Sequence, residues 1–273
     1  MKRIVTDQLG RIVVVPLEPQ RVISLVPSLT EYLHDLDLGE RLAGVTRYCS
    51  RPRDVVKGRV SVGGTKKFDF QRIASLKPDL VIANKEENYQ SGIEQLAEQY
   101  PVWVSDICDL DSALTALQSI AELVNRADTG RDMIHQIRHS FDQPLDAGLT
   151  EPPRVAYFIW RNPWMVCGSN NFIDDMLRRA GFHNVFTEHA DRYPAITMNK
   201  IAEMEPDFLL LSSEPFPFSE KHIEELRHLL PLCNACIVDA EPFSWYGSRL
   251  LHAADYFAKL NQQYVARDGC KGP

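Results

Sequence analysis

The chain has no long apolar segment. Within its 273 residues, no run approaches the roughly 20 apolar residues that a transmembrane helix needs. The N-terminus reads Met1-Lys2-Arg3, Ile4-Val5 and then Thr6-Asp7-Gln8, so it lacks the apolar core of a secretory signal peptide. The sequence as written predicts a cytoplasmic protein, or a periplasmic one if a leader has been removed.

An excess of basic charge is also missing. The chain has 30 Lys and Arg against 37 Asp and Glu, a net charge of −7, and its basic stretches at residues 47–59 and 66–67 are short or interrupted. Because phosphate backbones are bound by clustered Lys and Arg, no nucleic-acid partner is expected. A hydrophobic content of 44 % and a charged content of 25 % instead indicate a globular protein, long enough for two domains.

Several catalytic patterns are absent. The sequence contains no GxGxxG, no Walker phosphate loop and no GxSxG. An enzyme needs a converging acid–base or metal-binding set, and the candidates here are Asp106 and Asp239, which follow equivalent predicted strands. They leave open a metal-cluster or chelatase-like enzyme as the alternative to a binding protein.

The cysteines show no zinc pattern. Cys233-Asn-Ala-Cys236 has CxxC spacing, but no second CxxC or HxxxH stands near it in the sequence. Cys49 and Cys167 fall in predicted loops, where soft-metal ligation is the alternative to a structural thiol. Structural thiols and no intrinsic metal are expected, although six cysteines, Cys108 and Cys270 included, are many for a periplasmic protein.

An internal repeat dominates what is present. Three short landmarks recur in the same order about 130 residues later, which predicts two similar α/β lobes with a ligand cleft between them. The matched pairs are 21–25 with 154–158, 76–83 with 204–211, and 102–106 with 236–239.

Short apolar strands alternate with helical segments in both halves, the pattern of mainly parallel sheets covered by helices. The first 19 residues predict a β-hairpin, and a helix is expected from Leu29 to Gly39. Residues 109–142 have helical periodicity, which Asp128-Thr129-Gly130 interrupts or caps as a second segment. We therefore expect an N-terminal lobe (1–108), a helical segment with an interlobe helix (109–150) and a C-terminal lobe (151–273).

Motifs along nearly the whole chain resemble the helical-backbone substrate-binding proteins of ABC importers, which bind cobalamin, heme or ferric siderophores. They are Thr6-Asp7-x-x-Gly10-Arg11, Pro19-x-Arg21 to Ser28-x-Thr30-Glu31, Leu76-Lys77-Pro78-Asp79, Met204-x-Pro206-Asp207 and Ser248-Arg249. The segment Gly44–Pro52 is most similar to the cobalamin-binding branch.

The resemblance implies two α/β lobes bridged by one long helix, with aromatic side chains from both lobes against the ligand. A conjugated macrocycle gains most from such flat apolar faces, and cationic side chains suit its carboxylate or phosphate groups. For each aromatic residue the alternative is ordinary packing, and for Arg249 it is bracing the last helix. The candidate ligand residues are Tyr48, Trp164, Tyr193, Trp245, Tyr246, Arg47, Arg161 and Arg249.

The chain departs from the family at the permease-docking positions. The resemblance implies one glutamate on each lobe, and Gln71 and Asn199 stand at those positions. An uncharged amide cannot form the charge-assisted bond that a permease arginine would make. The expected function is binding of a corrinoid, heme or ferric siderophore by a monomer, either as an importer component or as a cytosolic derivative. A partnership with an ABC permease is in question.

Overall fold

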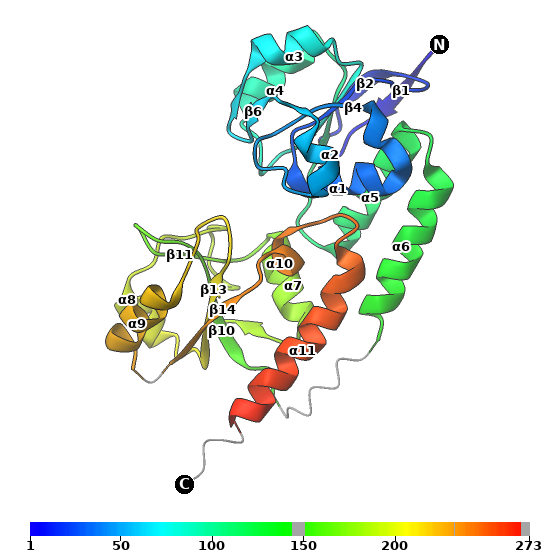
Figure 1. Ribbon diagram of the computed structural model, residues 1–273. Helices are drawn as coiled ribbons and strands as arrows, with labels where there is room; N and C mark the ends of the chain where they lie inside the picture. The colour runs from blue at the N-terminus through cyan, green and yellow to red at the C-terminus, as the bar shows by residue number, and fades with distance from the viewer. Residues whose placement is uncertain (144–150, 232, 269–273) are drawn as a thin grey trace. The chain divides into compact units, whose positions relative to one another are not determined.

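The computed structural model describes residues 1–143, 151–231 and 233–268, with side chains as far as residue 263. Cys270 and the predicted boundary at residue 150 lie outside the described residues. Contacts divide the chain into two compact units, and Figure 1 labels most of their helices and some of their strands. The first comprises Met1–Ile107, Asp111–Arg138 and Tyr246–Arg249, and the second comprises Cys108–Leu110, His139–Trp245 and the chain from Leu250.

The chain begins with the predicted hairpin, in which β1 (Lys2–Thr6) pairs antiparallel with β2 (Ile12–Pro16). The buried Asp7 carboxylate accepts hydrogen bonds from the backbone N–H groups of Leu9 and Arg11. Gly10 has φ = 76°, in the left-handed region that favours glycine. The Asp7-x-x-Gly10-Arg11 motif is therefore a turn signal.

The first unit contains a five-stranded parallel sheet in the order β5-β4-β3-β8-β9. Every residue of β8 and β9 is buried, as a sheet covered on both faces requires. The strands are β3 (Val22–Ser24), β4 (Leu42–Val45), β5 (Val60–Ser61), β8 (Leu80–Asn84) and β9 (Val102–Ser105), beside a small ladder of β6 (Gly63–Gly64) and β7 (Lys67–Phe68).

The helix expected from Leu29 to Gly39 is shorter than predicted. The α-helix ends at Leu33. Residues His34–Leu38 follow as a turn with a kink at Asp37, which has φ = 62°, and a 3₁₀ turn comes next. The helices that precede the second sheet are α1 (Pro27–Leu33), α2 (Arg53–Lys57), α3 (Phe70–Leu76), α4 (Gln90–Ala97), α5 (Leu110–Leu123) and α6 (Ala127–Phe141).

The periodic segment 109–142 forms two helices, α5 and α6. The break falls at Asn125, which has φ = 59°, and Asp128 lies in the first turn of α6. The boundary between the two units falls within α6, between Arg138 and His139.

The second unit has a sheet in the order β11-β10-β13-β14, with β12 also paired to β10. All pairs are parallel except β10–β11, which confirms the predicted α/β class with mainly parallel sheets in two units. The strands are β10 (Arg154–Trp160), β11 (Met165–Val166), β12 (His183–Asn184), β13 (Phe208–Ser212) and β14 (Asn234–Val238). The helices are α7 (Phe172–Arg179), α8 (Met198–Glu203), α9 (Glu220–Leu229), the unanticipated α10 (Glu241–Ser244) and α11 (Leu250–Asp268).

The sequence repeat has the same physical basis in both units. The Asp79 carboxylate accepts the backbone N–H of Arg21 at 2.8 Å, and Asp207 accepts that of Arg154 at 2.8 Å. Each arginine side chain also donates to a backbone carbonyl just before the Pro-Asp pair. The repeated Arg and Pro-Asp residues thus join the start of one strand to the start of its neighbour.

Candidate ligand-binding site

Arg47 and Tyr48 follow β4 at the carboxyl end of the first sheet, where ligands of parallel α/β folds bind. The Arg47 Cζ lies 5.5 Å from the centroid of the Tyr48 ring, and Tyr48 is 57 % exposed. A Cβ atom at Gly64 would lie 3.2 Å from both side chains, so glycine gives them room. The pair presents a flat ring and a cation to solvent.

Cys49 anchors this loop. Its Sγ lies 3.1 Å from Thr30 Oγ1 and 3.2 Å from Thr46 Oγ1. Burial raises the pKa of the Cys49 thiol, and the two hydroxyl contacts oppose that rise only in part. The contacts shown are those of a structural thiol.

Tyr246 and Arg249 belong to the first unit and hold internal contacts there. The Tyr246 hydroxyl donates to Glu87 Oε1 at 2.7 Å, and only 6 % of the residue is exposed. The Arg249 guanidinium binds both carboxylate oxygens of Glu31, each at 2.9 Å. Arg249 therefore braces α1 rather than the helix that it precedes.

Arg161 and Trp164 follow β10 in the second unit. Trp164 is 9 % exposed, and its ring is parallel to that of Phe218 with centroids 6.2 Å apart. The Arg161 Cζ lies 4.3 Å from the Trp164 ring, and the same guanidinium pairs with Glu225. The structure thus places Trp164 in the core of this unit, covered by an ion-paired arginine.

Trp245 follows α10 and is held by one carboxylate. Its indole N–H donates to Glu214 Oε1 at 2.6 Å, and 6 % of the residue is exposed. Burial raises the pKa of Glu214, although the hydrogen bond from Trp245 opposes the rise. Tyr193 is half-buried in a segment that lies beside β11, where the Val166 N–H donates to Pro194 O at 3.1 Å.

Four glutamates that sequence reasoning did not select as site residues hold the candidates in place. Glu31 stood in a motif, Thr30-Glu31, whereas the other three had no local signal because their partners are far away in sequence. They are Glu31, Glu87, Glu214 and Glu225.

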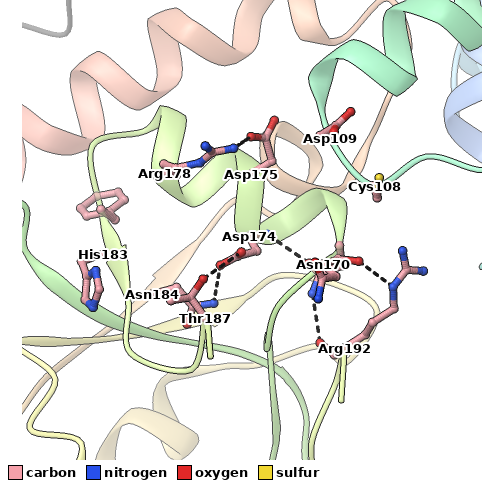
Figure 2. Close-up of a pocket in the computed structure, with 12 residues that line it drawn as sticks. Cys108, Asp109, Asn170, Asp174, Asp175, Arg178, His183, Asn184, Thr187 and Arg192 are labelled. Carbon is pink, nitrogen blue, oxygen red and sulfur yellow. Dashed lines mark hydrogen bonds and ion pairs between the residues drawn. The ribbon is translucent and has the colours of Figure 1, made fainter. Parts of the chain in front are cut away.

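A cavity of about 500 Å³ lies elsewhere in the second unit, around α7 and β12 (Figure 2). None of the eight predicted ligand residues lines it. Asp174 accepts hydrogen bonds from Asn184 and Thr187, and Asp175 accepts one from the Leu110 backbone. Because these carboxylates connect loops and strands of the fold, the cavity is better explained by structure than by ligand recognition.

Metal ligands are not grouped in the described part of the chain. Among those residues, no set of three or more His, Cys, Asp and Glu side chains could hold a metal ion. Asp106, a candidate residue of the enzyme alternative, forms an ion pair with Lys85 at 2.6 Å.

The family is decided by a match over residues 22–228, about three quarters of the chain, to the model of the periplasmic binding protein family. The chain belongs to this family. The match runs from β3 into α9 and so includes strands of both sheets. Its members are periplasmic binding proteins rather than enzymes, and no helix in the described residues is long and apolar enough to cross a membrane.

Relatives carry the name vitamin B12-binding protein. The one from Pectobacterium atrosepticum is 28 % identical over 246 residues, which cover 86 % of each chain. The one from Vibrio campbellii is 25 % identical over 197 residues, 71 % of this chain and 70 % of the relative. The family inferred from the sequence motifs is confirmed.

Solved structures show the same fold. The vitamin B12-binding protein BtuF of Vibrio cholerae has a TM-score of 0.76 at 19 % identity, covering 91 % of this chain and 100 % of that one. The periplasmic heme-binding protein RhuT from Roseiflexus sp. RS-1 has a TM-score of 0.76 at 20 % identity, covering 89 % and 98 %. At these identities the likeness extends to the fold alone.

Proposed function

We propose that the chain binds a large metal-containing ligand, a cobalt corrinoid ahead of heme or a ferric siderophore. It does so as the substrate-binding component of an ABC importer, or as a derivative of one. The observation that carries this proposal is the 28 % identity, over 86 % of each chain, to a protein named for binding vitamin B12.

In the first unit, Tyr48 and Arg47 are the direct contacts. The exposed Tyr48 ring offers the flat apolar face that a conjugated macrocycle covers, at a small cost in side-chain entropy. The Arg47 guanidinium suits a phosphate or carboxylate at the edge of that macrocycle.

In the second unit, the half-buried Tyr193 supplies an aromatic face, and Trp245, of which only 6 % is exposed, supplies one ring edge. The hydrogen bond to Glu214 fixes the Trp245 ring before the ligand arrives, so less conformational entropy is lost on binding. We propose that the remaining candidates support the contacting residues. Trp164 packs against Phe218 under the Arg161 guanidinium, and Arg161, Tyr246 and Arg249 are each bound to a glutamate.

Titration of the purified protein with aquocobalamin and, separately, hemin tests the proposal. Tryptophan quenching and the visible bands of each ligand are followed together. We expect saturable one-to-one binding of aquocobalamin, weakened about tenfold or more in Tyr48→Ala and nearly unchanged in Tyr48→Phe. Saturation by hemin alone would transfer the proposal to heme, and saturation by neither would refute the corrinoid and heme versions.

The two permease-docking positions concern the interaction with an ABC permease. Gln71 and Asn199 are exposed at the second residue of α3 and α8. Each helix is capped in the same way, by Asp69 or Thr197, whose side chain accepts a backbone N–H three residues later. We propose that any contact with an ABC permease proceeds without the two charge-assisted bonds that the family resemblance implies.

The compartment is a separate proposal. Cys49 and Cys233 form no disulfide with a described residue, and disulfides are rare in compartments that keep thiols reduced. We propose a cytoplasmic derivative of the periplasmic family. Recovery of the protein in the osmotic-shock fraction of its native cells would refute it.

A further inference from the structure

Glu214 lies at the carboxyl end of the second sheet, two residues after β13. Its Oε1 accepts the Trp245 indole N–H at 2.6 Å and the Ser244 hydroxyl at 3.4 Å. The residue is only partly buried, so one carboxylate both orients the Trp245 ring and retains access to solvent.

Two further carboxylates follow the neighbouring strand. Asp239 comes directly after β14, and Glu241 begins α10. The loops after β13 and β14 are tied together, since the Ser213 N–H donates to Val238 O at 3.0 Å and the Ser213 hydroxyl accepts the backbone N–H that precedes Glu241 at 3.0 Å. Burial is the largest cause of the raised pKa of Glu214, and the negative charges of Glu241 and Asp239 raise it further. The three carboxylates are therefore close enough to interact electrostatically.

Beneath these loops lie two hydroxyls that lack hydrogen-bond partners among the described residues. Tyr157 and Ser212 are each 0 % exposed, and neither hydroxyl has a partner. The charges of Glu214 and Asp239 act on the Tyr157 hydroxyl, which places it close to the same acids. Because neither hydroxyl is exposed, they make the protein beneath these loops polar without reaching a ligand themselves, and the carboxylates above them are the groups that a ligand meets.

We propose that Glu214 is a specificity-determining residue. It favours ligands whose periphery donates hydrogen bonds over ligands whose periphery carries carboxylates. This inference rests on the proposed function and narrows its ligand class. A corrin ring is fringed with neutral amides, whose N–H groups a carboxylate accepts, whereas heme carries two propionates. A propionate beside Glu214, Asp239 and Glu241 would meet like charge in a partly desolvated place, where repulsion is strong.

The test compares two ligands that differ in one group. Cyanocobalamin and its monocarboxylic acid, made by hydrolysis of one peripheral amide, are titrated against the wild type and Glu214→Gln at pH 7. Glutamine keeps an oxygen acceptor for Trp245, so near-ultraviolet circular dichroism should be unchanged. Glu203→Gln, at an exposed carboxylate on α8, is the matched control.

We expect the wild type and Glu203→Gln to bind cyanocobalamin about tenfold more tightly than the monocarboxylic acid. In Glu214→Gln that preference should fall to within about threefold, mainly through tighter binding of the acid. Binding of cyanocobalamin with the wild-type ratio retained in Glu214→Gln would overturn this inference alone. Absence of cyanocobalamin binding by the wild type would overturn the corrinoid proposal together with it.

Discussion

Arg249 and Glu31 are 218 residues apart in sequence, yet they form a two-point ion pair with both contacts at 2.9 Å. Their side chains are 25 % and 13 % exposed, so water screens the pair only in part. The pair joins the short segment Tyr246–Arg249 to α1 within the first unit.

Loss of this pair should destabilise the protein measurably. We predict that Glu31→Gln lowers the free energy of unfolding by about 1–3 kcal/mol, because the half-buried guanidinium loses its charged partner. Arg249→Lys should also cost stability, since an ammonium cannot form the two-point contact. Urea denaturation measures both. Glu203→Gln, which breaks an exposed pair with Lys200, should change stability by less than about 0.5 kcal/mol. Equal effects of Glu31→Gln and Glu203→Gln would contradict this account of the brace.

Substitutions of Trp164 and Tyr48 should distinguish an aromatic residue that packs in the core from one that contacts the ligand. Trp164→Ala should lower the free energy of unfolding by about 3–5 kcal/mol, because it leaves a cavity beside Phe218. Tyr48→Ala should change stability by less than about 0.5 kcal/mol and act on ligand affinity instead. Urea denaturation and ligand titration on the same samples measure both quantities. A Tyr48→Ala protein that is strongly destabilised would mean that Tyr48 serves the fold.

Restored charges at the docking positions should have two effects. Gln71→Glu and Asn199→Glu each place an anion in the first turn of a helix, which should stabilise the protein by about 0.3 kcal/mol at low salt. The double variant should also bind a reconstituted ABC permease of a vitamin B12 importer more tightly than the wild type does. Thermal unfolding at low and high salt and a proteoliposome pull-down measure these outcomes. Equal permease binding by both proteins would show that these positions do not limit docking.

Stability should depend on pH through Glu214. Burial raises its pKa above the ordinary value of about 4.5, so the native state holds this proton at a pH where the unfolded chain has released it. The stabilising contribution of protonated Glu214 is therefore present below the ordinary value and is lost as pH rises through the raised pKa. We predict that Glu214→Gln gains stability relative to the wild type between pH 4.5 and pH 7.5. Urea denaturation at both values tests this, and a difference that does not vary with pH would contradict it.

Local sequence patterns predicted which helices and strands occur better than where each of them ends. The apolar spacing of Phe70–Leu76 defined α3 to the residue, and Asp79 and Asp207 marked both repeats because each bonds a nearby strand start. The helix predicted from Leu29 to Gly39 extends beyond the observed helix, because nothing in its apolar periodicity shows that Asp37 adopts a positive φ.

The kinds of residue in the candidate site were predictable from the sequence, but the exposure and the contacts of each one were not. Aromatic residues in loops were found from the sequence, but whether each is exposed depends on partners far along the chain. Tyr48 is exposed, whereas Trp245 is held by Glu214, which is 31 residues away, and Tyr246 by Glu87, 159 residues away. Such side-chain pairs have no periodicity or spacing that a sequence alone reveals.

Equilibrium dialysis of the unmodified chain against cyanocobalamin tests the central claim most directly. The ligand bound per chain is measured from its visible absorbance as its free concentration rises. The corrinoid proposal predicts saturation at one cyanocobalamin per chain, with a micromolar or lower dissociation constant. Binding that rises linearly without saturation, or no retained cyanocobalamin, would contradict it.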